Sequence, residues 1–526
     1  MPRAVATLID WRAISGVMGC ARILGQAEQA TGLTADGRLR TGRLAGLTMG
    51  GAIWVLSWPI LVESALNSLV GLTDTTLAAR LPEGEAATDA IGGASYMMWF
   101  IGLIIMAMGV GATALISRSI GKGRVAVANA ALGQTLVLAV TVGGATGAFI
   151  ALIAPYLPAV IGLSPEAAPL FTEYMRIIAG GVPFMGILFA GIACARGAGD
   201  SVRPLHAMIV RNIVNIGVSF ALCGVDLGYT TMTDDGPVTT VFLRNPFEFN
   251  LGVFGIALGT VIGDAVGAGV ILWMAGRGVW GIRLRRARIA PHWHTIRRLV
   301  RLGVPNFLET LGMWFGNFLI LLIVGRLAVG AAGGLVGSHI VAIRIESFSF
   351  LPGFAMGMAA ATLAGQYLGA GSPARAIRAV LICAGIGGGF MGFIGLIFIL
   401  FPYPLTAALT EVPAHLEQAP KLLFICGLVQ LPFGLGLVFR SALRGAGDVR
   451  VVMILTWTTT YLIRLPLSWL LSGVVIPLPG GGEIPNPLGL EPSLSRLWIA
   501  MCAELAIRGA IFSLRFAQGT WTRAQV

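Results

Sequence analysis

Residues 53–80 read IWVLSWPILVESALNSLVGLTDTTLAAR. This run is long enough to cross a bilayer, which takes roughly 20 apolar residues, yet it contains two carboxylic acids and an asparagine. Four residues at helical spacing form one stripe of the predicted helix: Glu63, Asn67, Val70 and Asp74. Ionisable groups inside lipid are costly and usually face a bundle interior or a water-filled cavity. The stretch therefore predicts a transmembrane helix whose polar stripe faces a functional interior.

The pattern of this stretch returns 246 residues later in the chain. Pro59-x-x-x-Glu63 becomes Pro305-x-x-x-Glu309 at that offset. A second motif, Arg-Gly-Ala-Gly-Asp, stands at 196–200 and again at 444–448. Its glycines are suited to ending one helix and its aspartate to capping the next, so we expect tight turns there. The two offsets together predict a duplicated chain.

Composition places the chain among polytopic membrane proteins. Of its 526 residues 56% are hydrophobic and only 11% are charged, whereas soluble domains carry roughly 25% charged residues. The mean hydropathy is +0.83. The net charge of +12 does not predict a nucleic acid partner, because the basic residues lie in short segments between apolar runs. Six cysteines without Cys-x-x-Cys spacing are expected to be small core residues, with no disulfide framework or metal site.

The apolar runs predict an all-α protein with twelve transmembrane helices. They are continuous and lack the strict alternation of barrel strands. They lie near residues 50–78, 90–116, 126–154, 168–194, 203–224, 252–275, 303–325, 334–362, 376–401, 420–441, 451–472 and 496–516.

The distribution of Lys and Arg predicts the orientation. With the N-terminus inside, the inner segments hold 26 of the 36 basic residues and the outer segments hold 5. This ratio predicts that both termini are cytoplasmic. No continuous apolar region follows the first basic residues, so a cleaved signal peptide is not expected. Residues 14–24 have the spacing of a short amphipathic helix, and a partly disordered tail is the alternative.

Four segments follow from the duplication. They are a cytoplasmic tail (1–47), an N-lobe (48–276), a basic cytoplasmic linker (277–301) and a C-lobe (302–526). The linker holds eight arginines and no acid, so we expect it at the anionic inner leaflet. Each lobe has six spans and begins inside, which predicts parallel repeats related by an axis along the membrane normal.

Two long outer loops, 225–251 and 473–495, occupy equivalent places in the two halves. Acidic residues in these loops are Asp226, Asp234, Asp235, Glu248, Glu483 and Glu491. An acidic vestibule that attracts cations is one interpretation, and plain solvated loops are the other.

Three stretches carry a resemblance to a known family. GLTDTTLAARL at 71–81, the twin RGAGD turns, and AIRIESFSFLPGFAMGMAAATLAGQYLG at 342–369 resemble the multidrug and toxic compound extrusion (MATE) family. The similarity is closest to its prokaryotic DinF-like branch and covers about residues 48–472. It implies a monomeric, multi-pass transporter of the bacterial inner membrane. It also implies two six-helix lobes around a central cavity, which export organic cations or drugs by a rocking motion.

The resemblance also implies a coupling ion and site residues. Import of protons or sodium would drive export, with no other cofactor, and Asp74 is the residue at which sodium is considered. By position, Asp74 matches the family's first-span aspartate of the coupling and substrate site. Glu309 matches a seventh-span acid and Glu346 an eighth-span acid. Ile320 stands where the repeat would place a second Asp74, so the two lobes are expected to differ in chemistry.

Four further residues are predicted at the site, each with a structural alternative. Glu63 and Asn67 share the stripe with Asp74, although the repeat of Glu63 also suits helix packing. His339 lies on the same helical face as Glu346, which suits a proton relay or a hydrogen-bonded structural histidine. Asp264 is a lone acid in span six.

Two ion pairs are considered among the remaining charges of the spans. An ion pair with Arg344 is the structural alternative for Glu346. Glu504 and Arg508 are spaced i, i+4 and are expected to neutralise each other.

Other classes of function remain as alternatives. The nearest is a flippase for a lipid-linked or amphiphilic substrate on the same architecture, although the predicted intramembrane groups are mixed in charge. An integral-membrane enzyme would need a clustered catalytic set, and the sequence contains no H-E-x-x-H motif, nucleophile elbow or P-loop. We therefore expect a transporter and not an enzyme.

Overall fold

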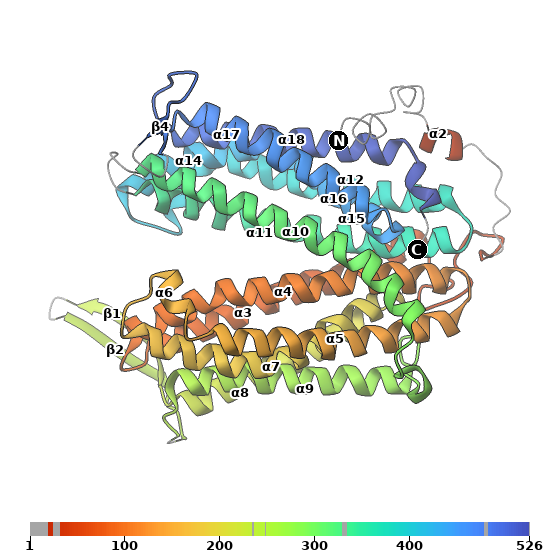
Figure 1. Cartoon of the computed structure of the whole chain (residues 1–526), viewed down its shortest axis with the longest axis horizontal. Coiled ribbons are helices and arrows are strands. Elements are labelled where there is room, and N and C mark those ends of the chain that lie inside the picture. Colours follow the sequence, from red (N-terminus) through yellow and green to blue (C-terminus); the bar gives the residue numbers. More distant parts are fainter. Residues whose placement is uncertain are drawn as a thin grey trace. The chain divides into compact units, whose positions relative to one another are not determined.

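The computed structural model describes residues 19–24, 32–233, 236–247, 249–328, 334–477 and 482–524. Most of them form helices (Figure 1). They divide into two compact units. Unit 1 comprises Met1–Ser57, Ser117–Gly123 and Val304–Val526, and unit 2 comprises Trp58–Ile116 and Arg124–Gly303. The predicted lobe and linker boundaries stay a prediction.

The twelve-helix fold predicted from the sequence is confirmed. Eleven helices are long and apolar enough to cross a membrane, and a bent pair of helices supplies the twelfth span within the described residues. The first six are α3 (Met49–Ala78), α4 (Gly84–Gly121), α5 (Val125–Ile153), α7 (Ala167–Gly197), α8 (Val202–Cys223) and α9 (Gly252–Arg277). The next are α10 (Trp293–Ala328), α11 (Leu335–Gly369), α12 (Pro373–Leu400), the pair α14 (Pro413–Gly427) and α15 (Gln430–Ala446), α16 (Val449–Trp457) continuing into α17 (Leu465–Ser472), and α18 (Leu494–Ala517).

Unit 2 is built from most of α3 and α4 together with α5 to α9. Helix α7 packs against α5 and α9, and α9 packs against α8. Small residues allow close helix contacts, as at Gly147, where an added Cβ would lie 2.2 Å from the carbonyl oxygen of Ala179. The short helix α6 (Leu157–Ile161) begins the connection from α5 to α7.

Unit 1 has its centre at α11, which packs against α12, α14 and α15. Helix α18 packs against α15 and α17, and the short α13 (Pro402–Ala407) packs against α14. The described part of the N-terminal segment also belongs here. Helix α2 (Gly19–Leu24) packs on α12 and α18, and the Cys20 thiol donates to the carbonyl oxygen of Phe516 at 3.0 Å. Residues 14–18 of the predicted amphipathic helix lie outside the described residues.

Two spans of unit 1 depart from regular α-helix, and a proline explains each departure. The α14–α15 span bends by 58°, four residues before Pro432, which cannot donate to the carbonyl of Leu428. In the other span a π-helix, η3 (Thr458–Arg464), joins α16 to α17 just before Pro466. Pro466 has no backbone N–H, and the wider π-turn compensates for this missing donor. Such turns are frequent at functional sites.

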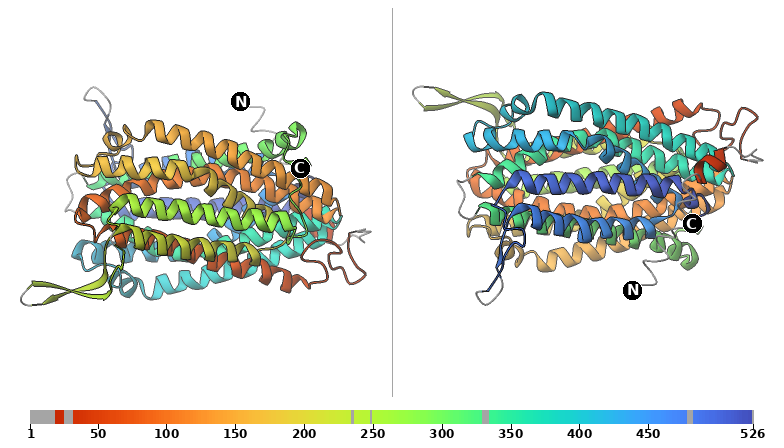
Figure 2. Two further views of the ribbon diagram at one scale, coloured as in Figure 1. Left: turned by 90° about the horizontal axis from the view of Figure 1, so that it is seen from below. Right: turned by 90° about the horizontal axis from the view of Figure 1, so that it is seen from above.

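Both long outer loops contain a feature that the sequence analysis did not predict. Strands β1 (Leu227–Thr233) and β2 (Gly236–Leu243) pair antiparallel, as do the short β3 (Ile476–Pro477) and β4 (Glu483–Ile484). The first hairpin extends beyond the ends of α8 and α9 (Figure 2). Asp234, Asp235 and Glu248, which the acidic-vestibule interpretation needs, lie outside the described residues.

The repeated turn motif forms the same turn in each unit. The second glycine of each copy has a left-handed backbone, with φ of 91° at Gly199 and 96° at Gly447. Asp200 then accepts a hydrogen bond from the backbone N–H of Arg203 and forms an ion pair with its guanidinium, both at 3.1 Å, whereas Asp448 forms an ion pair with Arg515 at 2.7 Å. The backbone of the motif is thus repeated, and the side-chain partners are not.

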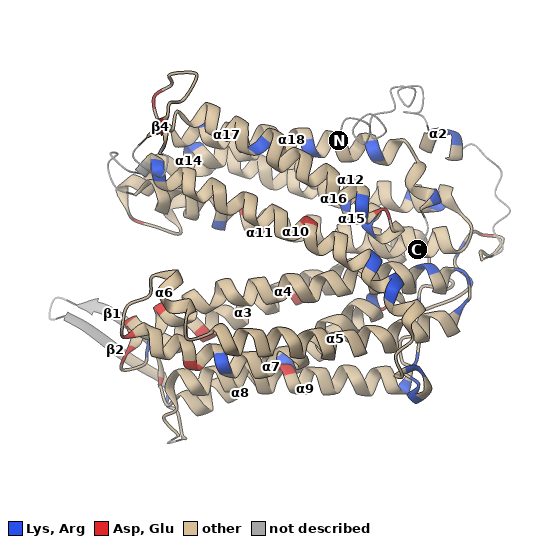
Figure 3. Ribbon diagram, viewed as in Figure 1, with Lys and Arg blue, Asp and Glu red and all other residues tan. Residues whose placement is uncertain are grey.

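Charge is unevenly distributed along unit 2. Figure 3 shows its Lys and Arg residues gathered near the end of α9 and the beginning of α10, around the short helix η2 (Arg286–Arg288). Helix α10 already begins at Trp293, inside the predicted linker. The middle of unit 2 contains fewer charged residues. These few residues form the candidate site of this unit.

Candidate functional site

Asp74 is the buried acid of unit 2 with the fewest fixed partners. It lies on α3 with 6% of its surface exposed. Its Oδ2 accepts a hydrogen bond from the hydroxyl of Thr260 at 3.3 Å, and Oδ1 has no partner. Asn215 in turn donates to the Thr260 oxygen at 3.0 Å, which orients that hydroxyl toward the carboxylate. No Lys or Arg among the described residues is close enough to form an ion pair with Asp74.

Asp264, predicted as a lone acid, has a cation of its own. It lies on α9 one helical turn after Thr260, and its Oδ1 accepts from Nε of Arg211 at 2.8 Å. Both side chains are buried, with 4% and 8% exposed. Arg211 also donates to Asn212 at 3.1 Å. Asp264 therefore has an ion-pair partner within unit 2, whereas Arg211 acts on Asp74 only from beyond ion-pair distance.

Three of the four stripe residues on α3 face the interior as predicted. Glu63, Val70 and Asp74 are buried, whereas Asn67 is exposed. The Glu63 carboxylate forms an ion pair with Arg196, the first residue of the first Arg-Gly-Ala-Gly-Asp motif. Because this pair is almost fully enclosed, it holds α3 to α7, and the structural alternative for Glu63 has direct support.

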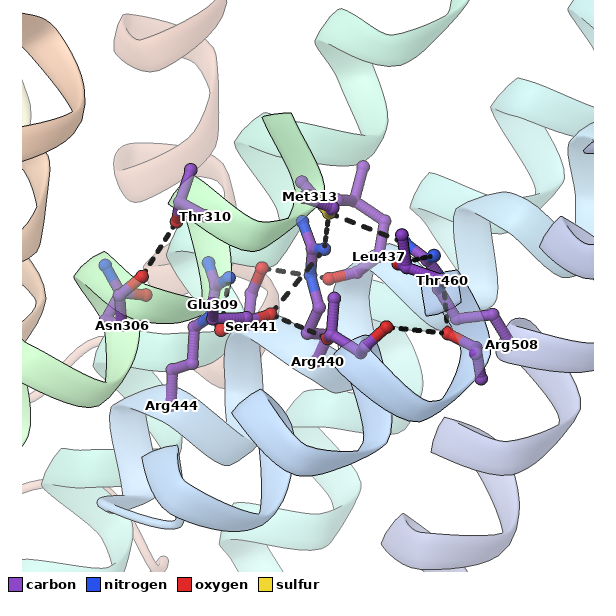
Figure 4. Close-up of polar contacts among 12 residues, drawn as sticks. Asn306, Glu309, Thr310, Met313, Leu437, Arg440, Ser441, Arg444, Thr460 and Arg508 are labelled. Carbon is purple, nitrogen blue, oxygen red and sulfur yellow. Dashed lines mark hydrogen bonds and ion pairs between the residues drawn. The ribbon is translucent and has the colours of Figure 1, made fainter. Parts of the chain in front are cut away.

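Glu309 on α10 has the corresponding partner in unit 1. Its Oε2 accepts from Nη2 of Arg444 at 2.7 Å, and Arg444 is the first residue of the second motif. The other oxygen accepts from the hydroxyl of Thr456 at 2.8 Å and lies 3.8 Å from Nη1 of Arg440 (Figure 4). The side chain of Glu309 is fully buried.

These two ion pairs join the repeated motifs. In both units, the acid of the Pro-x-x-x-Glu pattern pairs with the arginine that begins the Arg-Gly-Ala-Gly-Asp turn. Both repeats are visible in the sequence, but the contact between them was not predicted. Their nearly equal offsets, 246 and 248 residues, were the available signal, because a contact in one copy is expected to recur in the other.

A wider polar cluster in unit 1 surrounds the Glu309 pair. Arg508 on α18 forms an ion pair with Glu504 at 2.7 Å, as the i, i+4 spacing predicted. Its Nη2 donates to the Thr460 hydroxyl at 2.8 Å. Arg440 on α15 lies at the end of the predicted span 420–441, where a basic residue usually marks the cytoplasmic side, yet its side chain is only 13% exposed. Its position four residues before Arg444, hence on the same helical face, was the signal that could have placed it here.

His339 and Glu346 lie on α11 and have different hydrogen-bond partners, although Arg464 acts electrostatically on both. Nδ1 of the buried His339 accepts a hydrogen bond from the indole N–H of Trp498 at 3.0 Å. That bond supports the structural-histidine alternative. Glu346 is half-buried beside the Cys426 thiol, and Arg344 is exposed. The relay between His339 and Glu346 stays a prediction.

Twelve spans, a duplicated motif pair and buried ionisable groups define a helical membrane transporter. The chain matches the family model described as MatE over residues 59–221 and 305–470, so it belongs to the MatE family. It is therefore a transporter and not an enzyme, as expected. The match confirms the MATE resemblance, and the DinF-like branch stays a prediction.

Individual proteins agree with this assignment. A probable multidrug resistance protein NorM from Thermotoga maritima is 25% identical over 475 residues, which cover 90% of this chain and 93% of that protein. The multidrug resistance protein PmpM from Pseudomonas aeruginosa is 23% identical, with 79% of this chain and 83% of that protein covered.

Solved structures show the same fold. A crystal structure described as MATE in the bent conformation has a TM-score of 0.77 at 18% identity, covering 90% of this chain and 96% of that one. The outward-facing conformation of a multidrug resistance MATE family transporter of the MOP superfamily has a TM-score of 0.76 at 18% identity, covering 91% and 97%.

Proposed function

We propose that this protein is a secondary active antiporter that exports organic cations or drugs in exchange for protons or sodium. The observation that carries the proposal is Asp74, a buried carboxylate with one oxygen free and no ion-pair partner among the described residues. A buried carboxylate without an ion-pair partner attracts whichever cation reaches it. The names of the relatives, which are multidrug resistance proteins, agree with this class of substrate.

Exchange requires that Asp74 binds the coupling ion and the cargo in alternation. A proton would bind directly to the carboxylate. Sodium prefers oxygen ligands, and the carboxylate and the Thr260 hydroxyl supply two oxygens. Three of the other predicted acids have cations of their own: Glu63 has Arg196, Asp264 has Arg211 and Glu309 has Arg444. They suit a supporting role, in which they hold helices together while Asp74 changes its occupant.

Alternating access by a rocking motion completes the proposal. The repeated ion pairs would keep each bundle intact as a body during this motion, since each pair joins helices of one unit. We place the protein in the bacterial inner membrane as a monomer with both termini cytoplasmic. The excess of Lys and Arg in the inner segments supports this orientation.

The experiment uses purified protein in proteoliposomes with a cationic dye such as ethidium. A proton gradient and a sodium gradient are imposed separately, and dye movement is recorded for the wild type, Asp74→Asn and Asp89→Asn. The control residue Asp89 is an exposed aspartate of the same unit. We expect one gradient to drive transport, Asp74→Asn to abolish it and Asp89→Asn to leave it unchanged.

Two results would overturn the proposal. Normal transport by Asp74→Asn would remove the assigned role of that residue. If neither gradient moves the dye while a fluorescent lipid reporter is flipped, the flippase alternative replaces the antiporter.

A further inference from the structure

The polar cluster of unit 1 contains more buried positive than negative charge. It comprises Glu309, Arg440, Arg444 and Arg508 (Figure 4), together with Glu504. These residues come from α10, α15 and α18. Arg444 neutralises Glu309 and Arg508 neutralises Glu504. Arg440 is the third guanidinium, and it has no carboxylate of its own. A buried charge without a counter-charge is costly, so this surplus needs an explanation.

The N–H groups of Arg440 lack good hydrogen-bond acceptors. Its Nη1 lies 3.8 Å from Glu309, beyond hydrogen-bond distance, and makes its hydrogen bond to the thioether sulfur of Met313 at 3.2 Å. Its Nε has no partner at all. A thioether is a weak acceptor, so it satisfies a guanidinium far less well than an oxygen does.

Arg508 directs a donor at the same sulfur. Its Nη1 lies 3.4 Å from Met313 Sδ, while its Nε and Nη2 bind Glu504 and the threonines of the π-helix η3. Two cationic groups from different helices therefore converge on one weak acceptor. Methionine has a flexible side chain, so it can withdraw when a better acceptor arrives.

The backbone around the cluster brings further polar side chains to it. The π-helix η3 places Thr459 and Thr460 against Arg508, and it ends at Arg464, a buried residue whose Nε also has no partner. One acceptor in the cluster is free, Oε2 of Glu504. That oxygen would repel a second negative charge. Arg464 also acts electrostatically on Glu346, so four guanidiniums and three carboxylates leave a net surplus of one positive charge. This surplus corresponds to one negative charge on a ligand.

We propose that Arg440 and Arg508 form a binding site for a monoanionic group, such as a carboxylate, at the position that Met313 Sδ now occupies. Guanidinium groups bind carboxylates through paired, charge-assisted hydrogen bonds, which are the strong ones. Solutes with a single carboxylate fit this site, and a dianion does not, because Glu504 is adjacent. This inference goes beyond the proposed cation exchange at Asp74, and it does not depend on it.

Binding is measured on the full-length protein in detergent, without any transport step. Isothermal titration calorimetry with benzoate, neutral benzamide and inorganic sulfate compares a monoanion, an uncharged analogue of the same shape and a dianion. We expect benzoate to bind and the other two to bind at least tenfold more weakly. In Arg440→Met, benzoate affinity should fall at least tenfold, which corresponds to about 1.4 kcal/mol.

Matched variants separate the site from a general effect of charge. Arg440→Lys keeps the charge without the fork of donors and should retain part of the affinity. Arg378→Met removes an exposed arginine of the same unit and should leave benzoate affinity unchanged. Absence of benzoate binding to the wild type, equal binding by Arg440→Met, or tighter binding of sulfate would each overturn the proposal. Because no gradient or cargo cation is present, these results are independent of the antiport experiment.

Discussion

Replacing Glu309 with glutamine should destabilise the protein far more than the size of the change suggests. The substitution keeps the shape of the side chain and removes its charge. In the wild type, that charge neutralises Arg444 at 2.7 Å, attracts Arg440 at 3.8 Å and accepts a hydrogen bond from Thr456 at 2.8 Å. Glutamine leaves both guanidiniums in a buried site without a carboxylate.

The magnitude follows from the burial of the groups. Glu309 is fully buried, and the two arginine side chains are each 13% exposed. Removing one partner of a buried ion pair costs about 3–5 kcal/mol, because the other charge is left uncompensated. We therefore expect Glu309→Gln to lower the free energy of unfolding by about that amount. Removing Arg440 as well, in the double variant with Arg440→Met, should recover part of the loss because one unpaired guanidinium disappears with it.

Equilibrium unfolding of the purified protein in detergent, followed by tryptophan fluorescence, measures the difference. The control is Glu417→Gln, the same substitution in an ion pair with Lys421 whose side chains are 69% and 53% exposed. Exposed pairs contribute less than about 1 kcal/mol. If Glu309→Gln costs no more than Glu417→Gln, the buried pair does not stabilise unit 1 and the reasoning about both repeated pairs is wrong.

Two further substitutions test the packing of unit 1 by thermal unfolding. Gly509→Ala should cost about 1–3 kcal/mol, because the added Cβ would lie 2.2 Å from the carbonyl oxygen of Pro432. The control Gly389→Ala, with open space around it, should be neutral or stabilising. Equal effects of the two substitutions would contradict the close contact of α15 with α18. Trp498→Phe removes the hydrogen-bond donor to His339 and should cost about 1–3 kcal/mol of stability. The control Trp54→Phe, at a residue 66% exposed, should change stability by less than about 0.5 kcal/mol. Unchanged stability of Trp498→Phe would show that His339 does not need this hydrogen bond.

Helix number and type were predictable from the sequence because they depend on local properties. Continuous apolar runs of sufficient length specify membrane helices whatever their neighbours are. The α14–α15 bend and the π-helix η3 also have a local cause, namely Pro432 and Pro466, yet neither was predicted. A proline shows that one backbone hydrogen bond is missing from a helix. Whether the chain then bends or forms a wider turn depends on the surrounding helices.

The candidate site was predictable only in part, because ion pairing depends on contacts between distant segments. The burial of Asp74 and Glu63 followed from their spacing along one helix. Nothing in the sequence near Asp264 indicated that Arg211, 53 positions earlier, would neutralise it. The position of Arg440 near the end of a span also did not indicate a buried site, because arginine there is usually a topology signal.

The repeat shows how the two units acquired different charges on one scaffold. At the offset of 246, Asp74 of unit 2 corresponds to Ile320 of unit 1, which is buried among apolar residues. At the offset of 248, Arg440 of unit 1 corresponds to Ile192 of unit 2, which is also buried.

The Glu–Arg pair is common to both units, and at these two positions each unit has a charge where the other has isoleucine. A buried charge without a counter-charge of its own does not stabilise a fold, so packing does not account for either one. Two such charges of opposite sign, each in its own unit, are accounted for by ligands: a cation at Asp74 and an anionic group at Arg440.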